Sequence, residues 1–178
     1  DNGTIMSSTD NGTSFDNVTS PTANRISGVT FGNNTFVGVG NSGNIVRSTD
    51  NGTTWDNATS TTANHLYIVG FGNNTFVAAG YGGNIVRSSD NGSSWDNATS
   101  PTTNNFLGVG FLYNTFVAVG ASGNIVRSTD NGITWDNVTS PTSKDLYGIG
   151  TSSNYLLGGS IQGKALKLTG EVTTFAGT

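Results

Sequence analysis

Four aspartates spaced 40 residues apart are the most conspicuous candidates for chemistry in this chain. Asp10, Asp50, Asp90 and Asp130 each lie in a segment of the form S-S/T-D-N-G. A carboxylate at such a turn can accept backbone N–H hydrogen bonds, and carboxylate oxygens are also ligands for Ca²⁺. The extended segment D-N-G-x-x-W-D lacks the ligand spacing of an EF-hand loop. We therefore expect the aspartates to stabilise turns, and we expect no metal site.

A column of arginines accompanies the aspartates, one in each of three repeats. A ring of arginines could bind a carboxylate ligand, but each arginine has an aspartate nearby in its own repeat. We expect local ion pairs, which join Arg47 to Asp56, Arg87 to Asp96 and Arg127 to Asp136.

Other reactive side chains are few, and an active site needs unlike residues that converge on one place. The single histidine, His65, has no histidine at the matching position of another repeat, and we expect it at the surface. The single glutamate, Glu171, lies in the most degenerate part of the chain. The absence of Cys excludes a cysteine nucleophile, and no glycine motif cradles phosphate. We expect no catalytic residue, no cofactor and no enzymatic activity.

The composition narrows the class of protein further. Only 33% of the 178 residues are hydrophobic and 10% charged, whereas globular domains average about 45–50% and about 25%. Gly, Thr, Asn and Ser make up just over half of the chain and are poor helix formers, which excludes a long helical protein. No run of 18 apolar residues exists, so we expect no membrane-spanning helix. A net charge of −4 argues against nucleic acid as a partner.

The candidate residues recur because the whole chain is a repeat of 40 residues. In the copy 61–100, four apolar runs separated by turn residues predict strands over 66–71, 74–80, 84–89 and 93–99. We call the first two strands of a repeat the A–B hairpin and the last two the C–D hairpin. Asn-Gly and Asn-Asn turns favour tight hairpins. Four antiparallel strands in about 40 residues predict one blade of a β-propeller, ranked above a parallel β-helix.

Stacked blades would supply the core that a single blade lacks. Two columns of phenylalanines are expected to pack between blades: Phe31, Phe71 and Phe111, and Phe36, Phe76 and Phe116.

The repeat boundaries predict an incomplete blade within a single repeat domain, 1–178. The domain divides into a half repeat, three full repeats and a degenerate repeat: 1–20, 21–60, 61–100, 101–140 and 141–178. The C–D half occurs five times and the A–B half four times. The expected fold is therefore an all-β propeller of four to five blades. It is either a five-bladed ring with one incomplete half-blade or a four-bladed body with a surplus hairpin.

The C–D hairpin resembles the Asp-box, or BNR repeat, with the pattern S-x-D-x-G-x-x-W. Complete copies are Ser48, Asp50, Gly52 and Trp55, then Ser88, Asp90, Gly92 and Trp95, then Ser128, Asp130, Gly132 and Trp135. The first copy, Ser8, Asp10, Gly12 and Phe15, has Phe in place of Trp, and the last has lost the box, with Gly170 and Phe175 in place of Asp and Trp.

The whole unit is similar to repeats of Ycf48-type photosystem II assembly factors and of sialidase- and sortilin-type propellers. This resemblance implies a propeller whose boxes are structural and lie away from any active site. The arginine triad, tyrosine nucleophile and partner acids of sialidases are not matched.

Asn-x-Ser/Thr sequons are frequent, and one column directly follows the box aromatic. If the source organism glycosylates asparagine, this column would carry a glycan on the outer strand of each blade: Asn17, Asn57, Asn97 and Asn137.

Together these features favour a secreted structural or adhesive propeller at the cell surface, which could be a subunit of an extracellular fibre. The chain begins at Asp1 without an initiator Met, which suits a processed, exported product or a portion of one. The unpaired half-blade predicts self-association, because an open strand edge can pair with another chain. The alternative is a glycan-binding propeller with repeated sites between blades, built from Trp, Asn and Asp. An assembly-factor scaffold and an engineered repeat protein also fit the pattern.

Overall fold

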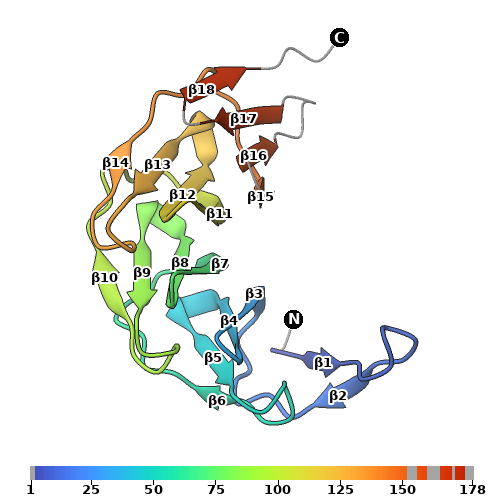
Figure 1. Ribbon diagram of the computed structural model, residues 1–178. Coiled ribbons are helices and arrows are strands. Elements are labelled where there is room, and N and C mark those ends of the chain that lie inside the picture. Colours follow the sequence, from blue (N-terminus) through green and yellow to red (C-terminus); the bar gives the residue numbers. More distant parts are fainter. Residues whose placement is uncertain (1–2, 152–155, 160–164, 170, 175–178) are drawn as a thin grey trace.

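The computed structural model describes residues 3–151, 156–159, 165–169 and 171–174. It contains four antiparallel four-stranded sheets, each built from consecutive strands, and one two-stranded sheet at the N-terminus (Figure 1). The strands of the two-stranded sheet and of the first two blades are β1 (Ile5–Ser7), β2 (Asp16–Val18), β3 (Ile26–Gly32), β4 (Thr35–Gly40), β5 (Ile45–Ser48), β6 (Asp56–Asn57), β7 (Leu66–Gly72), β8 (Thr75–Gly80), β9 (Ile85–Ser88) and β10 (Asp96–Ala98).

The third and fourth blades repeat this order. Their strands are β11 (Phe106–Leu112), β12 (Thr115–Gly120), β13 (Ile125–Ser128), β14 (Asp136–Asn137), β15 (Gly148–Thr151), β16 (Leu156–Gly159), β17 (Ala165–Thr169) and β18 (Glu171–Thr174). Three short 3-10 turns join the A–B to the C–D hairpins: η1 (Asn41–Gly43), η2 (Tyr81–Gly83) and η3 (Ala121–Gly123). They are the helical elements of the described residues, and none could span a membrane.

The A–B hairpins of the first three blades close through two-residue turns, as the sequence predicts. Gly72 pairs with Thr75, and the two residues between them, Asn73 and Asn74, have φ angles of 45° and 55°. Two positive φ angles are the signature of the type I′ turn, whose twist matches that of the flanking strands. Asn tolerates this conformation better than most residues, which explains why it recurs at these turns.

The C–D hairpins of the first three blades have longer connections than the sequence predicts. In the second blade, β9 ends at Ser88 and β10 begins at Asp96, so the predicted strand 93–99 is shortened at its start. The intervening loop, 89–95, contains the rest of the Asp-box after Ser88. Its residues leave the ladder because the Asp-box side chains, not a partner strand, satisfy the backbone N–H groups there.

Successive blades pack face to face, and this stacking makes the hydrophobic core. The first such cluster lies between the first and second blades, and its buried members are Val37, Val39, Ile45, Leu66, Val69, Phe76, Ala78, Val86 and Trp95. Phenylalanines of the predicted columns cross these interfaces: a Cβ on Gly32 would overlap the ring of Phe71. Glycine at this position therefore lets the aromatic ring of the next blade pack against the backbone.

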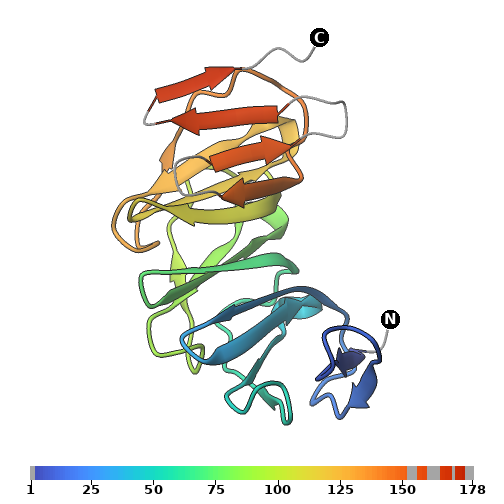
Figure 2. The same cartoon turned by 45° about the vertical axis from the view of Figure 1, so that its right-hand side comes forward.

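The four blades form an open arc. Strands β3, β7, β11 and β15 follow one another along its concave side, while β6, β10 and β14 lie at its outer edge (Figure 1). The two-stranded sheet, β1–β2, stands beyond the first blade, at the opposite end of the arc from β15–β18 (Figures 1 and 2). The described chain is thus a four-bladed body with a surplus C–D hairpin, the second of the two predicted arrangements.

Candidate functional site

The Asp-box of the second blade is a closed network of hydrogen bonds within one loop. Ser88 Oγ donates to Asp90 Oδ1 at 2.7 Å and accepts the backbone N–H of Gly92 at 2.9 Å. The other carboxylate oxygen of Asp90 accepts the Oγ hydroxyl of Ser94 at 2.6 Å. The indole Nε1 of Trp95 donates to the carbonyl of Gly92 at 3.1 Å. The four motif residues are therefore brought together, and they satisfy one another.

A fifth box residue is not part of the motif as the sequence analysis defined it. The Ser or Thr four residues after the aspartate donates both its N–H and its hydroxyl to the carboxylate, as Thr54 does to Asp50 at 2.9 and 2.6 Å. The only signal for it in the sequence is that a hydroxyl residue occupies this position in all four boxes: Ser14, Thr54, Ser94 and Thr134.

These hydrogen bonds hold all four box carboxylates in the charged form. The side-chain and backbone hydrogen bonds from Thr54 lower the pKa of Asp50 to about 2, and those from Thr134 do the same for Asp130. Burial alone would raise the pKa of Asp90, but its hydrogen bonds from Ser94 outweigh burial and lower the pKa to about 2. Since hydrogen bonds to the charged form favour it, each aspartate is a fixed structural anion.

The same saturation argues against metal binding or acid–base chemistry at the boxes. A metal ion would have to displace hydroxyl and N–H donors that already occupy the carboxylate oxygens, and a general base needs a pKa near the working pH. Within the described residues, no cluster of three or more His, Cys, Asp or Glu side chains could hold a metal ion.

The boxes of the second and third blades also contact the blade before them. Asn91 Nδ2 donates to Thr35 Oγ1 at 2.6 Å, and Asn91 Oδ1 accepts the Nδ2 group of Asn33 at 3.3 Å. Both partners belong to the A–B hairpin of the first blade. At the next interface, Asn73 Nδ2 donates to Asn131 Oδ1 at 2.7 Å. The box asparagine thus joins consecutive blades.

The prediction that the arginines pair with local aspartates is wrong for the described residues. Arg47 and Asp56 are cross-strand neighbours, but the guanidinium of Arg47 donates to Ser93 Oγ in the box of the next blade. Arg87 Nε likewise donates to the carbonyl of Asn131 at 3.0 Å. These long side chains reach across the interface because the box loop there offers hydroxyl and carbonyl acceptors.

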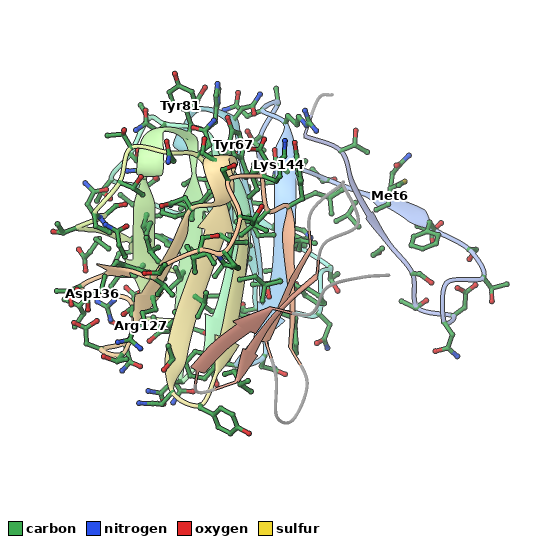
Figure 3. All side chains as sticks on the ribbon, turned by 90° about the horizontal axis from the view of Figure 1, so that it is seen from above. Met6, Tyr67, Tyr81, Arg127, Asp136 and Lys144 are labelled. Carbon is green, nitrogen blue, oxygen red and sulfur yellow. The ribbon has the colours of Figure 1, made fainter. Side chains whose placement is uncertain are left out.

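The third arginine lies at the outer edge of the molecule. Arg127 is exposed and stands opposite Asp136 on the neighbouring strand (Figure 3).

His65 has an inter-blade partner that the sequence analysis did not predict. Its Nδ1 accepts the backbone N–H of Ser42, in η1 of the preceding blade, at 2.9 Å. Asn105 Oδ1 and Asp145 Oδ1 accept the equivalent N–H groups of Gly82 and Ser122, each at 2.8 Å. His, Asn and Asp differ in type, but each is an acceptor. His65 is therefore part of a structural column.

Two of the predicted glycosylation asparagines make side-chain contacts with the segment that leads into the first strand of their own repeat. Asn57 Nδ2 donates to the carbonyl of Pro21 at 2.9 Å, and Asn97 Oδ1 accepts the hydroxyl of Thr61 at 3.2 Å. A glycan on Asn57 would be attached to the same Nδ2 atom that holds Pro21. Glycosylation of the column stays a prediction.

The box aromatics are not equivalent. Trp95 is 1% exposed and Trp135 is 5% exposed, and both indole N–H groups are occupied by backbone carbonyls. A sugar could not stack on either ring, so the proposed glycan sites built on these tryptophans are not available. Phe15 is 61% exposed, and Trp55 is half-buried.

The exposed aromatics mark a cavity at the N-terminal end of the arc. Its volume is about 470 Å³, and it lies between strand β1 and the first blade. The first blade contributes mainly Ile26, Val29, Phe36 and Trp55 to its walls. We call this cavity the N-terminal slot. It is the candidate functional site, since the boxes, Arg47 and Arg87 make contacts within the arc.

The family of the chain follows from its sequence. Residues 1–107 match the family described as "DUF6242 beta propeller domain". The chain belongs to this family. No match was found among curated proteins.

Solved structures share its architecture at low sequence identity. "YCF48 bound to D1 peptide" is 20% identical with a TM-score of 0.70, and the alignment covers 97% of this chain and 61% of that one. The computationally designed Ika4 protein is 13% identical with a TM-score of 0.63, over 86% of this chain and 92% of that one. A nidogen/laminin complex contains a chain 12% identical with a TM-score of 0.71, over 87% and 64%.

These likenesses bear on the predicted fold. The β-propeller fold and the resemblance to Ycf48 are confirmed. The chain spans about three fifths of the YCF48 chain that it matches.

Proposed function

We propose that the protein is a non-enzymatic structural propeller of an extracellular surface, and that it assembles with neighbouring copies through its incomplete first half-blade. One observation carries the proposal: β1–β2 is a C–D hairpin without an A–B hairpin, beside an apolar slot. An unpaired strand edge next to uncovered apolar surface is the usual arrangement for association by strand addition.

The other candidate sites support a structural role. The box carboxylates are saturated by their own loops, and Arg47 and Arg87 bind the next blade. The box carboxylates and these two guanidinium groups are therefore engaged in contacts that stabilise the arc. Among the residues that the structure describes, an apolar surface with room for a partner lies at the N-terminal end, beside β1.

A neighbouring copy would supply the A–B hairpin that the first half-blade lacks. Placement of an A–B hairpin of one copy at the β1 edge of the next would be a heterologous contact. Such head-to-tail contacts produce open chains unless the rotation closes a ring.

Molar mass in solution tests this assembly. Size-exclusion chromatography with light scattering should give masses above that of the monomer for residues 1–178, rising with concentration. A version that lacks residues 1–20 should stay monomeric. Equal monomeric masses for both proteins at all concentrations would refute the assembly.

Protein segments are the class of partner that one similar structure favours. Its description is YCF48 bound to D1 peptide, so a propeller of related architecture binds a peptide. Recognition of a protein segment requires no exposed tryptophan platform, which suits the burial of Trp95 and Trp135.

A further inference from the structure

The geometry points to the occupant of the N-terminal slot: we infer that the slot binds a β-hairpin with the sequence pattern of this protein's own A–B hairpins. The hairpin would pair antiparallel with β1 in the register that joins β4 to β5. This inference deepens the proposed function and rests on it only for the source of the hairpin.

The first argument is that blade 1 has an uncovered face whose equivalent is covered in blade 2. Val29 is 61% exposed, whereas Val69, its counterpart 40 residues later, is 4% exposed. Phe36 is half-buried, and its counterpart Phe76 is fully buried. In blade 2 this face is covered by Val37, among others, from the A–B hairpin of blade 1.

The second argument is the free edge of β1. Ile5, Met6 and Ser7 correspond to Ile45, Val46 and Arg47 of β5, which pair with β4 on one side and β6 on the other. In the two-stranded sheet β1 pairs only with β2. Met6 is accordingly 62% exposed and lies on the hairpin that projects from the blades (Figure 3).

The direction of the backbone groups on that edge can be deduced from β5. The N–H of Ala58 donates to the carbonyl of Ile45 at 2.9 Å, so Ile45 faces β6. Hydrogen-bonding direction alternates along a strand, and Val46 therefore faces β4. Its counterpart Met6 presents its N–H and C=O to the vacant side of β1.

The third argument is that the polar rim of the slot matches an A–B turn. Asn91 is held by Asn33 and Thr35 of the preceding A–B hairpin. Its counterpart Asn51 is exposed and lines the slot. An incoming Asn-Asn turn followed by Thr would offer Asn51 the same two partners.

The backbone of the slot also specifies residue types in the occupant. A Cβ on Gly92 would lie 3.0 Å from Val37 Cγ2, whereas a Cβ on Gly52 would meet nothing within 4 Å. In the second blade, a valine of the preceding A–B hairpin fills the space over Gly92. The equivalent space over Gly52 is vacant and could take a valine of the occupant. Phe31 is exposed where Phe71 packs on Gly32, so the occupant needs glycine at the end of its first strand. The pattern that these contacts specify is G-N-N-T-x-V, which residues 32–37 and 72–77 both contain.

The probe for this inference is a synthetic peptide with the sequence of residues 25–41, titrated into the intact chain. Trp55 lines the slot, while Trp95 and Trp135 are already buried. Docking should shift Trp55 fluorescence to shorter wavelength, and Trp55→Phe should remove the signal. A peptide with Val37→Asp and Val39→Asp should bind at least tenfold more weakly.

Variants of the protein test the location. Val29→Asp should weaken peptide binding at least tenfold, and Met6→Pro should weaken it by removing the edge N–H, a substitution that edge strands tolerate. Ile133→Asp, an equally drastic change at an exposed position outside the slot, should leave affinity within twofold. Circular dichroism should be unchanged in all three, and the peptide can be followed by anisotropy of an attached dye.

No binding of the peptide, or equal binding by Val29→Asp and Ile133→Asp, would overturn the inference. Equal binding of the double-Asp peptide would overturn it too, because it would show a general apolar site. Peptide binding at the slot by a chain that is monomeric at all concentrations would support the inference and refute self-assembly. If the chain self-associates, Val29→Asp leaves this association unchanged and the peptide does not bind, the inference about the slot is refuted while self-assembly is supported.

Discussion

The first and second blades have nearly the same sequence and the same strand pattern, yet one face of the first is exposed and that of the second is core. Val29 and Val69 occupy equivalent positions, and they differ in exposure because only Val69 has a preceding A–B hairpin against it. Burial in this fold is therefore a property of the interface between repeats. The same residue is a core residue or a binding residue according to its neighbour.

The largest difference in stability between the N-terminal hairpin and the complete blades should come from substitution of the box aromatics. Trp95→Ala removes a fully buried ring and should lower the free energy of unfolding by about 3–5 kcal/mol. Phe15→Ala, at the matching position of the N-terminal hairpin, is exposed and should change it by less than about 0.5 kcal/mol. Urea denaturation followed by circular dichroism measures both. Similar losses for the two variants would mean that the hairpin is packed as the blades are.

The box glycines should show a smaller difference. Gly52 and Gly92 have φ angles of +83° and +79°, so alanine at either position is strained by about 1 kcal/mol. Only Gly92→Ala also places its Cβ against Val37, which should add about 1 kcal/mol or more. Urea denaturation of the two variants gives the difference. If Gly52→Ala were as costly as Gly92→Ala, the space over Gly52 would not be vacant.

The acceptor column at the 3-10 turns should have a smaller effect still. His65→Leu removes the acceptor for the Ser42 N–H and should cost about 1 kcal/mol, the usual net value of one hydrogen bond. His65→Asn should restore most of this stability, because Asn105 serves the same purpose one repeat later. Thermal and urea unfolding compare the two variants. A loss for His65→Asn as large as for His65→Leu would show that the ring, not its acceptor, matters.

The smallest effect per residue should be the acid sensitivity of the boxes, since their carboxylates are close to solvent. The folded-state pKa of about 2 lies below the ordinary value of 3.8. The stabilisation is therefore fully present above pH 4 and is lost as the pH falls from about 4 towards 2. The urea midpoint should fall in this window, and Asp90→Asn should make the decline shallower.

The N-terminal hairpin, β1–β2, provides a control for the acid sensitivity of the boxes. Asp10 also has a pKa lowered to about 2, first by the backbone N–H and then by the hydroxyl of Ser14. Carboxyl NMR should thus give similar low values for Asp10 and Asp90, although their surroundings differ in packing. A normal value for Asp10 alone would mean that the box needs a preceding blade to form.

Much of the fold could be predicted because it depends on short-range patterns. The period of 40 defines the blades, and Asn73-Asn74 between two apolar runs specifies a two-residue turn. The surplus C–D half at residues 1–20 also follows from counting repeats. The excess length predicted for the strand at 93–99 has a local cause, since Ser93 and Ser94 serve the Asp-box instead of the ladder.

The contacts of the candidate site were less accessible to sequence reasoning. Arg47 stands opposite Asp56 within its sheet, and nothing in one repeat indicates that it reaches Ser93, 46 positions away. His65, Asn105 and Asp145 do not look like a column, because they share a hydrogen-bonding capacity and not a residue type. The slot arises where such long-range partners are missing, so it needed the arrangement of blades to be seen.

The backward reach of each box has a mechanical consequence. Asn91 binds the A–B turn of the blade before it, and Arg47 binds the box after it, so the first blade is held by the second. Asn131 and Arg87 hold the second blade to the third in the same way. Coupling of this nearest-neighbour kind makes a chain pulled at its ends come apart in units of one repeat. Each unit would release about 40 residues, roughly 130–140 Å of contour length. Under force we expect the arc to unfold from its last blade, one repeat at a time.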